Sequence, residues 1–556
     1  MSETKQQSKH TAPLPCGGAG GGSLYYKIFH ELNNIPRPSH HEEKVADYLC
    51  AFADKHGLTW RRDKQNCVVI EKPASPGYES HEPVVILNHM DMVCVAEPGK
   101  KFNPLTDGIE AIIVDSKNHQ LDGSSPLMPQ SKCPWDRSRE GAWMRANRTS
   151  LGADNGIGLS MALAILADDT LPHPALEVLT TTNEEDGMSG ASQLAADFIH
   201  GRRVLNLDSE AYDEITIGAA GALIQTARLP FHKIQMPQGY VTYDVTVTGG
   251  LGGHSGVDIN KGRANAIKVL ANLLLVAIRQ CDIKLYLVNF EGGNAAASIP
   301  GNAHAKVIVP QDKTEQFDML VTQCDEALEA EFSETDPNIQ VDSVPAVWHG
   351  AVVSEEGTHL LLACINGIPV GPTEMLDDSE TPMTSNNIGL VTMQSATATT
   401  HHPSTNAKPS TALAALSPWG RAGREAITPN TFIISTHTRS FDDKKMENLA
   451  DQIRRIFEVS GAEVQLVMNA PAWKEDESNS LVSLTCDTFK DVLGFEPKKV
   501  SMHFVLEAGY LVKTFPGLHI ASIGPRILEP HSTHERVELS TVDNIWKVAI
   551  EILKRL

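Results

Sequence analysis

The sequence predicts an α/β protein: a mostly parallel sheet with helices on both faces, interrupted by a second domain of α+β type. Three observations predict this. The 556 residues exceed what one hydrophobic core usually organises. Short apolar runs alternate with helical patterns in the first part of the chain, as parallel sheets require. After Gly221 the pattern changes, and near Trp473 the first pattern returns.

In the first part, from Tyr25, residues 41–57 have helical periodicity and end at Gly57. Apolar, strand-like runs follow at 67–72, 83–88, 175–182 and 203–207, and residues 155–169 predict a helix between them. Strands that alternate with helices favour a parallel sheet that is buried on both faces.

The middle of the chain has a different pattern. Residues 240–249 alternate apolar and polar side chains, which is typical of a half-exposed antiparallel strand, and residues 262–280 predict an amphipathic helix. We therefore expect a flexible tail at 1–24, a first domain at 25–221, an inserted domain at 222–472 and a return to the first domain at 473–556. Segments rich in Ser, Thr, Pro and Ala at 116–140 and 394–430 predict inserted loops, and no internal sequence repeat is visible.

Charge and cysteine content exclude several classes of function. The net charge of -22 disfavours nucleic-acid and anionic-membrane partners, because both bind basic surfaces. The nine cysteines have no CxxC pair or regular spacing, which favours a reducing compartment. No signal-peptide pattern and no run of 18 apolar residues occurs, so we expect a cytoplasmic protein.

Metal-ligating side chains stand where the predicted strands end. His89 and Asp91 follow one strand, Glu184 and Glu185 another, Asp208 a third and His531 a fourth. Asp154 stands at the predicted N-cap of the helix that begins near Asn155. Because ligands bind outside the carboxyl ends of parallel strands, we expect these side chains to meet in one site.

The residue types favour zinc, with cobalt or manganese as substitutes. Closely packed carboxylates repel one another, and a pair of divalent cations removes that repulsion. Neighbours on a strand point to opposite sides, so one of Glu184 and Glu185 can bind metal while the other acts as a general base. Asp91 stands two residues after His89, where it can orient the imidazole.

Each of these signals is weak alone, and their agreement favours a metal site. Two rival motifs fail on spacing: "HSTHE" at 531–535 does not match the HxxEH order of inverted zincins, and "GGHSG" at 252–256 is not a GxSxG nucleophile elbow.

Taken together and in order, the motifs "HMDMV", "LGADNGIG", "TNEEDGMSGA", "LNLDSE", "GGHSG", "PAW" and "SIGP…PHSTHE" resemble those of the co-catalytic zinc peptidase family. That family includes carnosinase, peptidase T, aminoacylase and, nearest in its motifs, the aminoacyl-histidine dipeptidases (peptidase D). The resemblance runs from about Tyr25 to the C-terminus. It implies a catalytic domain split by a lid domain, two Zn²⁺ per subunit, a small peptide substrate with a free amino terminus, and a homodimer.

The resemblance also implies roles for individual residues. The metal ligands would be His89, Asp154, Glu185, Asp208 and His531, with Asp154 bridging. Asp91 would orient His89, and Glu184 would be the general base. His254 would reach the substrate carbonyl across a dimer or a closed interface, and Arg439 would lie near the substrate carboxylate.

The chain departs from the family in two places. Ala296 and Ala297 replace an Arg-Asn pair, whose Asn is expected to contact substrate, and Val505 replaces a glycine. Two rivals to a dipeptidase therefore stay open. One is an aminoacylase-like or tripeptidase-like amidase, and the other is a metal-binding relative that has lost catalysis.

Overall fold

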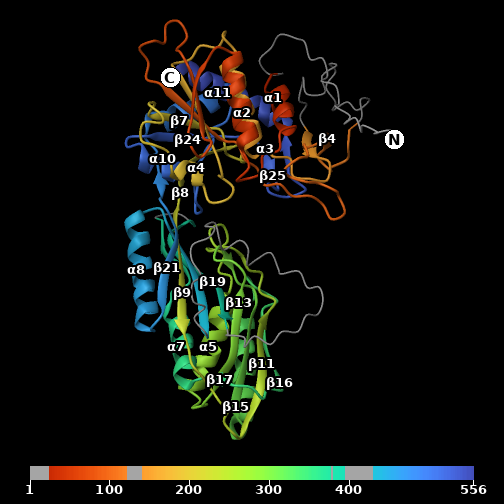
Figure 1. The fold of residues 1–556 in the computed structure, drawn as a ribbon, viewed down its shortest axis with the longest axis vertical. Coiled ribbons are helices and arrows are strands. Elements are labelled where there is room, and N and C mark those ends of the chain that lie inside the picture. The colour runs from red at the N-terminus through yellow and green to blue at the C-terminus, as the bar shows by residue number, and fades with distance from the viewer. Residues whose placement is uncertain (1–23, 122–140, 377–379, 395–429) are drawn as a thin grey trace, which may run out of the picture. The chain divides into compact units, whose positions relative to one another are not determined.

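The computed structural model describes residues 24–121, 141–376, 380–394 and 430–556 (Figure 1). The predicted tail, most of the insertion at 116–140 and all but the two ends of that at 394–430 lie outside these ranges. The chain divides into two compact units. Unit 1 contains the described residues up to Gly218, then Lys474–Ser501 and Glu507–Leu556, and unit 2 contains Ala219–Trp473 and Met502–Leu506. Unit 2 thus interrupts unit 1, and a short later segment also belongs to it.

Unit 1 is built on a sheet that is parallel in its centre. The described strands run in the order β1 (Thr59–Arg62), β2 (Val68–Lys72), β6 (Leu176–Thr181), β3 (Val84–His89), β7 (Arg203–Asn206), β24 (His519–Ser522), β8 (Glu214–Ala219) and β22 (Trp473–Lys474), with β23 (Lys498–Met502) also paired to β8. The pairs β6–β3, β3–β7 and β7–β24 are parallel. The pairs β1–β2, β2–β6 and β24–β8 are antiparallel. The carboxyl ends of the central strands therefore share one edge.

Helices and loops cover both faces of this sheet. The helices are α1 (Leu24–Asn33), α2 (Glu43–Lys55), α3 (Ala153–Ala167), α4 (Ser189–Ser192), α9 (Ser480–Leu493), α10 (Ala508–Thr514) and α11 (Leu539–Arg555). Val84 and Ile86 of β3 join one hydrophobic core with α1, α3 and α11. Val85 and Leu87, which point to the opposite face, are also fully buried. The predicted α/β architecture is confirmed.

A small sheet of unit 1 carries the segment that leads to His531. Its order is β25 (Ile527–Leu528), β26 (Arg536–Glu538), β5 (Ala142–Ala146) and β4 (Ala111–Asp115), and its pairs are antiparallel. His531 therefore stands in the turn between β25 and β26, beyond the end of β24. The sequence had indicated that His531 directly follows a strand of the main sheet. That expectation is wrong.

Unit 2 contains an antiparallel sheet with helices packed against it. The described strands run in the order β16 (Gln340–Ala346), β11 (Tyr240–Thr248), β15 (Ala303–Pro310), β13 (Tyr286–Gly293), β19 (Pro382–Gln394), β20 (Thr431–Ser440), β9 (Gly221–Pro230) and β21 (Glu463–Ala470), and β18 (Gly371–Met375) pairs with β19. Two short pairs are β10 (Lys233–Ile234) with β17 (Val352–Val353) and β12 (Gly253–His254) with β14 (Ser298–Ile299). The helices are α5 (Ala266–Arg279), α6 (Thr314–Phe332), α7 (Glu355–Gly367) and α8 (Asp443–Val459), and a 3₁₀ turn, η2, spans Gln311–Lys313.

The sheet of unit 2 consists of two topological repeats. In chain order one repeat is β11, α5, β13, β15, α6 and β16, and the other is β9, α7, β19, β20, α8 and β21. The first repeat is inserted after β9 of the second. Within each repeat the strands take the same relative order, and the two repeats join where β13 pairs with β19. Helix α5 lies against β11, β13 and β15, and α8 lies against β9, β20 and β21 (Figure 1).

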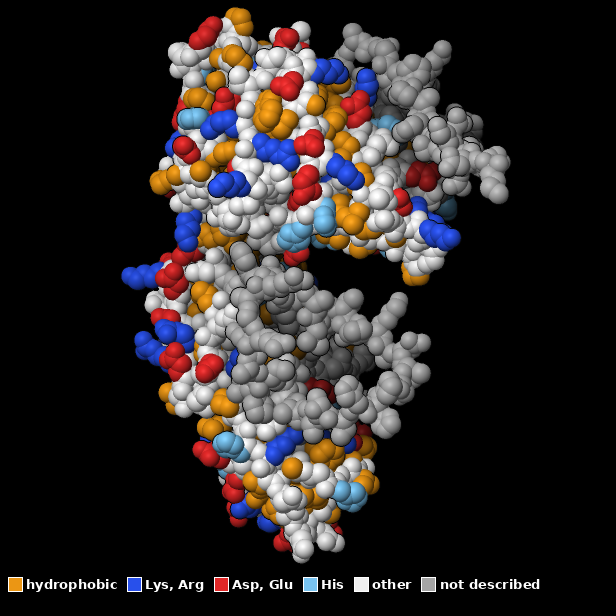
Figure 2. Space-filling view, viewed as in Figure 1, with side chains coloured by type: hydrophobic (Ala, Val, Ile, Leu, Met, Phe, Trp, Pro, Cys, Tyr) orange, Lys and Arg blue, Asp and Glu red, His pale blue; other side chains and the backbone are white. Residues whose placement is uncertain are grey.

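The predicted helix at 262–280 begins later than expected, because Asn265 acts as its N-cap. The Asn265 side chain accepts a hydrogen bond from the Lys268 backbone N–H at 3.2 Å. On the face shown in Figure 2, acidic and basic side chains are interspersed over each unit. Among the described residues, no helix combines the length and apolarity that crossing a membrane requires.

Candidate metal centre

Unit 1 brings together the side chains that the sequence places at its strand ends. They form two groups with ligand atoms within 4.8 Å of one another: His89, Asp154 and Asp208, and Asp154, Glu185 and His531. Asp154 belongs to both groups. Its Oδ1 lies 3.1 Å from His89 Nε2, and its Oδ2 lies 3.1 Å from His531 Nε2.

The remaining distances complete the two groups. His89 Nε2 lies 3.3 Å from Asp208 Oδ1. His531 Nε2 lies 2.8 Å from Glu185 Oε2. A carboxylate that presents one oxygen to each of two imidazole-containing groups has the geometry of a bridging ligand.

The electrostatics of this cluster fit cations. Burial and the neighbouring carboxylates of Asp208, Glu185 and Glu507 raise the pKa of Glu184 well above its usual value. Hydrogen bonds to Asp154 and Glu185 raise the pKa of His531 to about 11. Burial opposes ionisation of Asp154, but hydrogen bonds from His531 and His89 hold its pKa below the usual range. The carboxylates outnumber the imidazoles, and nitrogen and oxygen donors of this kind suit zinc.

Asp91 organises the protein around His89 and the two glutamates. Its Oδ1 lies 3.5 Å from His89 Nδ1, an ion-pair distance too long for a well-formed hydrogen bond. Its carboxylate also accepts hydrogen bonds from the backbone N–H groups of Glu184 at 3.1 Å and Glu185 at 3.2 Å, and from Ser39 Oγ at 2.8 Å. Asp91 therefore fixes the backbone from which both glutamates project.

Two local expectations differ from the structure. Strand β6 ends at Thr181, so Glu184 and Glu185 stand in a turn, where the alternation of a strand does not apply. Glu185 nevertheless contacts His531, whereas Glu184 belongs to neither of the two groups that could hold a metal. Asp154 is not the N-cap of α3, because this helix begins one residue earlier, at Ala153. Its ψ of 114° is extended, and its oxygens face the two histidines.

Several residues of this centre were missed by the sequence reasoning. The Glu535 carboxylate accepts hydrogen bonds from four successive backbone N–H groups, those of Leu151, Gly152, Ala153 and Asp154. The buried Arg37 guanidinium donates to the carbonyls of Met90, Asp91 and Gly152. These two residues hold the backbone that carries Asp91 and Asp154. Of these two residues, only Glu535 stands in a motif with a sequence signal, "HSTHE". That motif indicated a possible zincin and not the hydrogen bonds that Glu535 accepts from the backbone.

Two further carboxyl groups lie beside the cluster. Burial and the charge of Asp154 raise the pKa of Glu210 to about 8. Burial raises that of Glu507 to about 8 as well, although Thr181 Oγ1 donates to this carboxylate at 2.6 Å. Glu210 ends the "LNLDSE" motif, and Glu507 follows the substituted Val505.

His254 and Arg439 lie in unit 2, where Arg439 is buried on β20. His254 Nδ1 accepts hydrogen bonds from the backbone N–H groups of Gly256 at 3.3 Å and Val257 at 3.1 Å. Burial and the charge of Arg439 lower the pKa of His254. The imidazole is therefore neutral near pH 7 and carries its proton on Nε2, as a hydrogen-bond donor.

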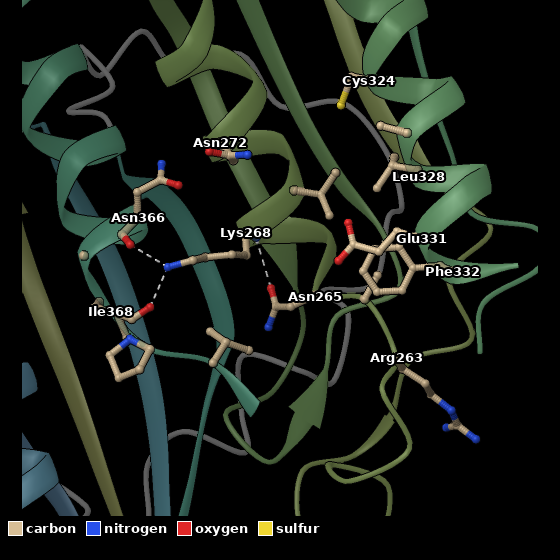
Figure 3. Close-up of a pocket in the computed structure, with 16 residues that line it drawn as sticks. Arg263, Asn265, Lys268, Asn272, Cys324, Leu328, Glu331, Phe332, Asn366 and Ile368 are labelled. Atoms are coloured by element: carbon tan, nitrogen blue, oxygen red, sulfur yellow. Dashed lines mark hydrogen bonds between the residues drawn. The ribbon is translucent and has the colours of Figure 1, made fainter. Parts of the chain in front are cut away.

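A separate cavity of about 720 Å³ lies in unit 2 between α5, α6 and the end of α7 (Figure 3). Lys268 crosses this cavity, and its amine donates to the carbonyls of Ile365, Asn366 and Ile368 at 2.5 to 3.0 Å. These carbonyls end α7, so the Lys268 charge caps that helix. None of the predicted site residues lines the cavity.

Comparison with known proteins defines the class. Residues 241–336, which include α5, β13, β15 and all of β11 except Tyr240, match the peptidase dimerisation domain. The crystal structure of aminoacylhistidine dipeptidase from Vibrio alginolyticus has a TM-score of 0.78 and 28% identity, with 97% of this chain and 98% of that chain covered. The aminopeptidase PepT from Bacillus cereus ATCC 10987 shares the fold at a TM-score of 0.53 and 15% identity, over 96% of this chain and 98% of that chain. The fold is that of metallopeptidases with an inserted dimerisation domain.

The cytosol non-specific dipeptidase of Escherichia coli (strain K12) is 30% identical over 534 residues, which cover 96% of this chain and 97% of that protein. The chain belongs to the M20 family of metallopeptidases. This membership confirms the family that the sequence motifs resemble.

Proposed function

We propose that the chain is a metal-dependent dipeptidase that hydrolyses Xaa-His and related dipeptides with a free amino terminus. The observation that carries the proposal is Asp154, one carboxylate shared by two groups of metal-ligating side chains. In this proposal His89, Asp154 and Asp208 would hold one Zn²⁺, and Asp154, Glu185 and His531 would hold another. Co²⁺ or Mn²⁺ can substitute, because these ions accept the same nitrogen and oxygen donors. The residues 25–221 and 473–556 form the catalytic domain, and 222–472 form the lid and dimerisation domain.

The metals, when bound, would supply Lewis acidity toward the carbonyl and lower the pKa of the attacking water. Glu184 is the general base. Its carboxylate lies beside the cluster without belonging to either group, and burial keeps its pKa high enough to accept a proton. Cations on the neighbouring carboxylates would bring that pKa down toward neutrality. Glu184 takes a proton from water and returns it to the leaving amine.

His254 donates from Nε2 to the carbonyl oxygen, where negative charge develops. The two backbone N–H groups on Nδ1 fix the tautomer that this role needs. Arg439 binds the substrate carboxylate. We further propose a cytoplasmic homodimer, supported by the dimerisation domain at 241–336 and by the name of the E. coli relative.

Glu184→Gln tests the proposal. We expect kcat toward dipeptides to fall by about 100-fold or more, the usual scale of acid–base assistance, while two equivalents of zinc stay bound. Asp186→Asn is the matched control, because Asp186 stands in the same turn and pairs with the exposed His40 at 2.9 Å. Near-normal turnover of the Glu184→Gln variant at full zinc occupancy would contradict the assignment of the base.

A second candidate is an amidase that prefers tripeptides or N-acyl amino acids. It is favoured by Ala296 and Ala297, which replace the Arg-Asn pair of the family. A panel of dipeptides, tripeptides and N-acyl amino acids, assayed with added zinc, cobalt or manganese, separates the two. Hydrolysis of no member of the panel by the zinc-loaded protein would favour a non-catalytic relative.

A further inference from the structure

The turn that carries Glu184 and Glu185 begins at Asn183, whose backbone is left-handed with a φ of 53°. Three successive backbone N–H groups at the start of this turn donate to buried carboxylates. Asp91 accepts from the N–H groups of both glutamates. The N–H group of Asn183 donates to Oε1 of Glu42 at 2.9 Å. The turn is therefore held by two acids that come from different parts of unit 1.

The Glu42 side chain serves this turn and not its own helix. Glu42 stands at the N-cap of α2, but its side chain makes no capping hydrogen bond there. Its Oε1 instead accepts from the backbone N–H groups of Asn183 at 2.9 Å and His40 at 3.1 Å. Burial and the nearby Asp91 carboxylate raise the pKa of Glu42 to about 7. A carboxylate only 3% exposed, beside another acid, costs stability unless its hydrogen bonds compensate.

The Asn183 side chain ties the turn to the segments on both sides of it. Its Oδ1 accepts from the His40 backbone N–H at 2.6 Å, and its Nδ2 donates to Ser189 Oγ, at the start of α4, at 2.9 Å. Asparagine is also one of the few residues that adopt a left-handed backbone at low cost. Glu42 and Asn183 together therefore fix the backbone one residue before Glu184.

Glu42 differs from Asp91 in what else it contacts. Asp91 lies 3.5 Å from His89, so a change of Asp91 also disturbs a proposed metal ligand. Within the described chain, the hydrogen bonds of the Glu42 side chain run to the backbone of His40 and Asn183. Glu42 is therefore the acid whose loss would loosen the turn without removing a contact of a proposed ligand.

We propose that Glu42 and Asn183 are positioning residues for Glu184: by holding the backbone at the start of its turn, they keep its carboxylate where it can take a proton. This inference rests on the proposed function for the role of Glu184. A general base works only within hydrogen-bond reach of the proton that it abstracts. A misplacement of about 1 Å can lower the rate about 100-fold. Loss of this support therefore lowers kcat more than it changes KM.

Paired substitutions separate the hydrogen bonds from the volume of the side chain. Glu42→Met keeps the length of the side chain but removes the acceptor. Glu42→Gln keeps an oxygen that can stand at the Oε1 position and accept from both N–H groups. Asn183→Gly removes the side-chain amide and leaves the left-handed backbone accessible.

The matched control is Glu177, another buried acid of unit 1 with the same kind of contacts. Glu177 is 5% exposed, and its carboxylate accepts from the backbone N–H groups of His200 and Gly201 at 2.7 to 3.0 Å. It lies on β6, the strand that leads to the Glu184 turn, but near the opposite end of that strand. Glu177→Met therefore removes comparable backbone hydrogen bonds away from the turn.

Steady-state kinetics with alanyl-histidine at saturating zinc measure the effect. We expect Glu42→Met and Asn183→Gly to lower kcat about 10-fold to 100-fold per folded, zinc-loaded molecule, with a smaller change in KM. Glu42→Gln should keep most of the wild-type kcat. Glu177→Met should keep it as well, even where its free energy of unfolding falls as much as that of Glu42→Met.

Hydrogen exchange of the backbone amides of residues 183–185 gives a readout besides activity. This exchange should become faster in Glu42→Met and Asn183→Gly and stay unchanged in Glu177→Met, because only the first two variants release the turn.

An equal loss of kcat in Glu42→Met and Glu177→Met, or a wild-type kcat in Glu42→Met, would overturn the inference. So would a loss in Glu42→Gln as large as in Glu42→Met, or unchanged exchange at residues 183–185. If Glu42→Met does not fold, Asn183→Gly carries the same comparisons. A wild-type protein that hydrolyses no peptide, with the exchange results as expected, would defeat the proposed function and leave intact the hold of Glu42 and Asn183 on the turn.

Discussion

Replacing Glu535 by Gln should weaken the metal centre without touching a proposed ligand. Oε1 of Glu535 accepts from the backbone N–H groups of Ala153 at 2.7 Å and Asp154 at 3.4 Å, and Oε2 accepts from those of Leu151 at 2.7 Å and Gly152 at 2.9 Å. Gln has the same shape but presents an NH₂ group in place of one oxygen. Whichever way the amide is turned, two backbone donors then face a donor.

The size of the effect comes from those two donors. A buried N–H group left without an acceptor costs about 1–3 kcal/mol, so the free energy of unfolding should fall by roughly 2–6 kcal/mol. Asp154 is the last of the four residues whose backbone N–H groups donate to Glu535. Losing a hydrogen-bond partner that supports a metal ligand typically reduces metal affinity about 10-fold to 100-fold. We therefore expect both quantities to fall together.

Urea denaturation of the zinc-loaded protein measures the first quantity, and competition with a chelator of known affinity measures the second. Glu529→Gln is the control, because Glu529 is exposed in the same segment. A Glu535→Gln variant that matches the control in both measurements would refute the idea that Glu535 positions Asp154.

Three further outcomes are expected. Asp154→Ala should lose both metal ions, because one carboxylate serves both groups; metal analysis that finds two equivalents bound would exclude the bridge. His254→Ala should retain metal and fold normally but lose kcat about 100-fold with little change in KM, as removal of an oxyanion donor does, and steady-state kinetics measure this. In the folded chain, burial and the charge of Arg439 lower the pKa of His503 to about 3, against 6.5 in the unfolded chain. Between these two pH values His503 is neutral in the folded state, whereas the unfolded state binds a proton there. Stability should therefore fall as pH drops below 6.5, by about 2 kcal/mol between pH 7 and pH 5, and urea titrations of His503→Asn should lack this part of the pH dependence.

The structure brings the predicted metal-ligating residues close to one another, and the sequence could indicate this because each of them stands next to an element with a strong local signal. His89, Asp208 and the Glu184–Glu185 pair follow apolar runs whose strand character is clear, and parallel strands bring their ends together. Asp154 is found by the same logic at a helix start. The details depend on turns, which local patterns describe poorly. Thus the turn after Thr181 and the small sheet that carries His531 were not predicted.

Supporting residues were harder to predict. Arg37 and Glu535 form hydrogen bonds with backbone groups that are far away in sequence. The residues next to Arg37 and Glu535 in the sequence form no pattern that would predict these hydrogen bonds. The repeats of unit 2 leave no visible sequence signature, because one is inserted within the other and only strand order reveals them. The place of His503 was hidden for a similar reason, because it belongs to unit 2 but stands in a segment that follows the return to unit 1.

The strand order of unit 2 reads the same from either end, and this symmetry decides which edges are open. Strands β13 and β19 each cover the inner edge of the other repeat, so neither offers its backbone to another molecule along the paired residues. The outer edges are β16 and β21. Both carry exposed apolar side chains: Val344 on β16 is 50% exposed, and Leu466 on β21 is 53% exposed. Strand edges that lack a partner on one side invite pairing. The short strand β18 pairs with β19 along one side, so it adds a third edge among the described strands. A second chain that joins by extending this sheet can use β16, β21 or β18, and a single charged or proline substitution on one of these strands would tell which.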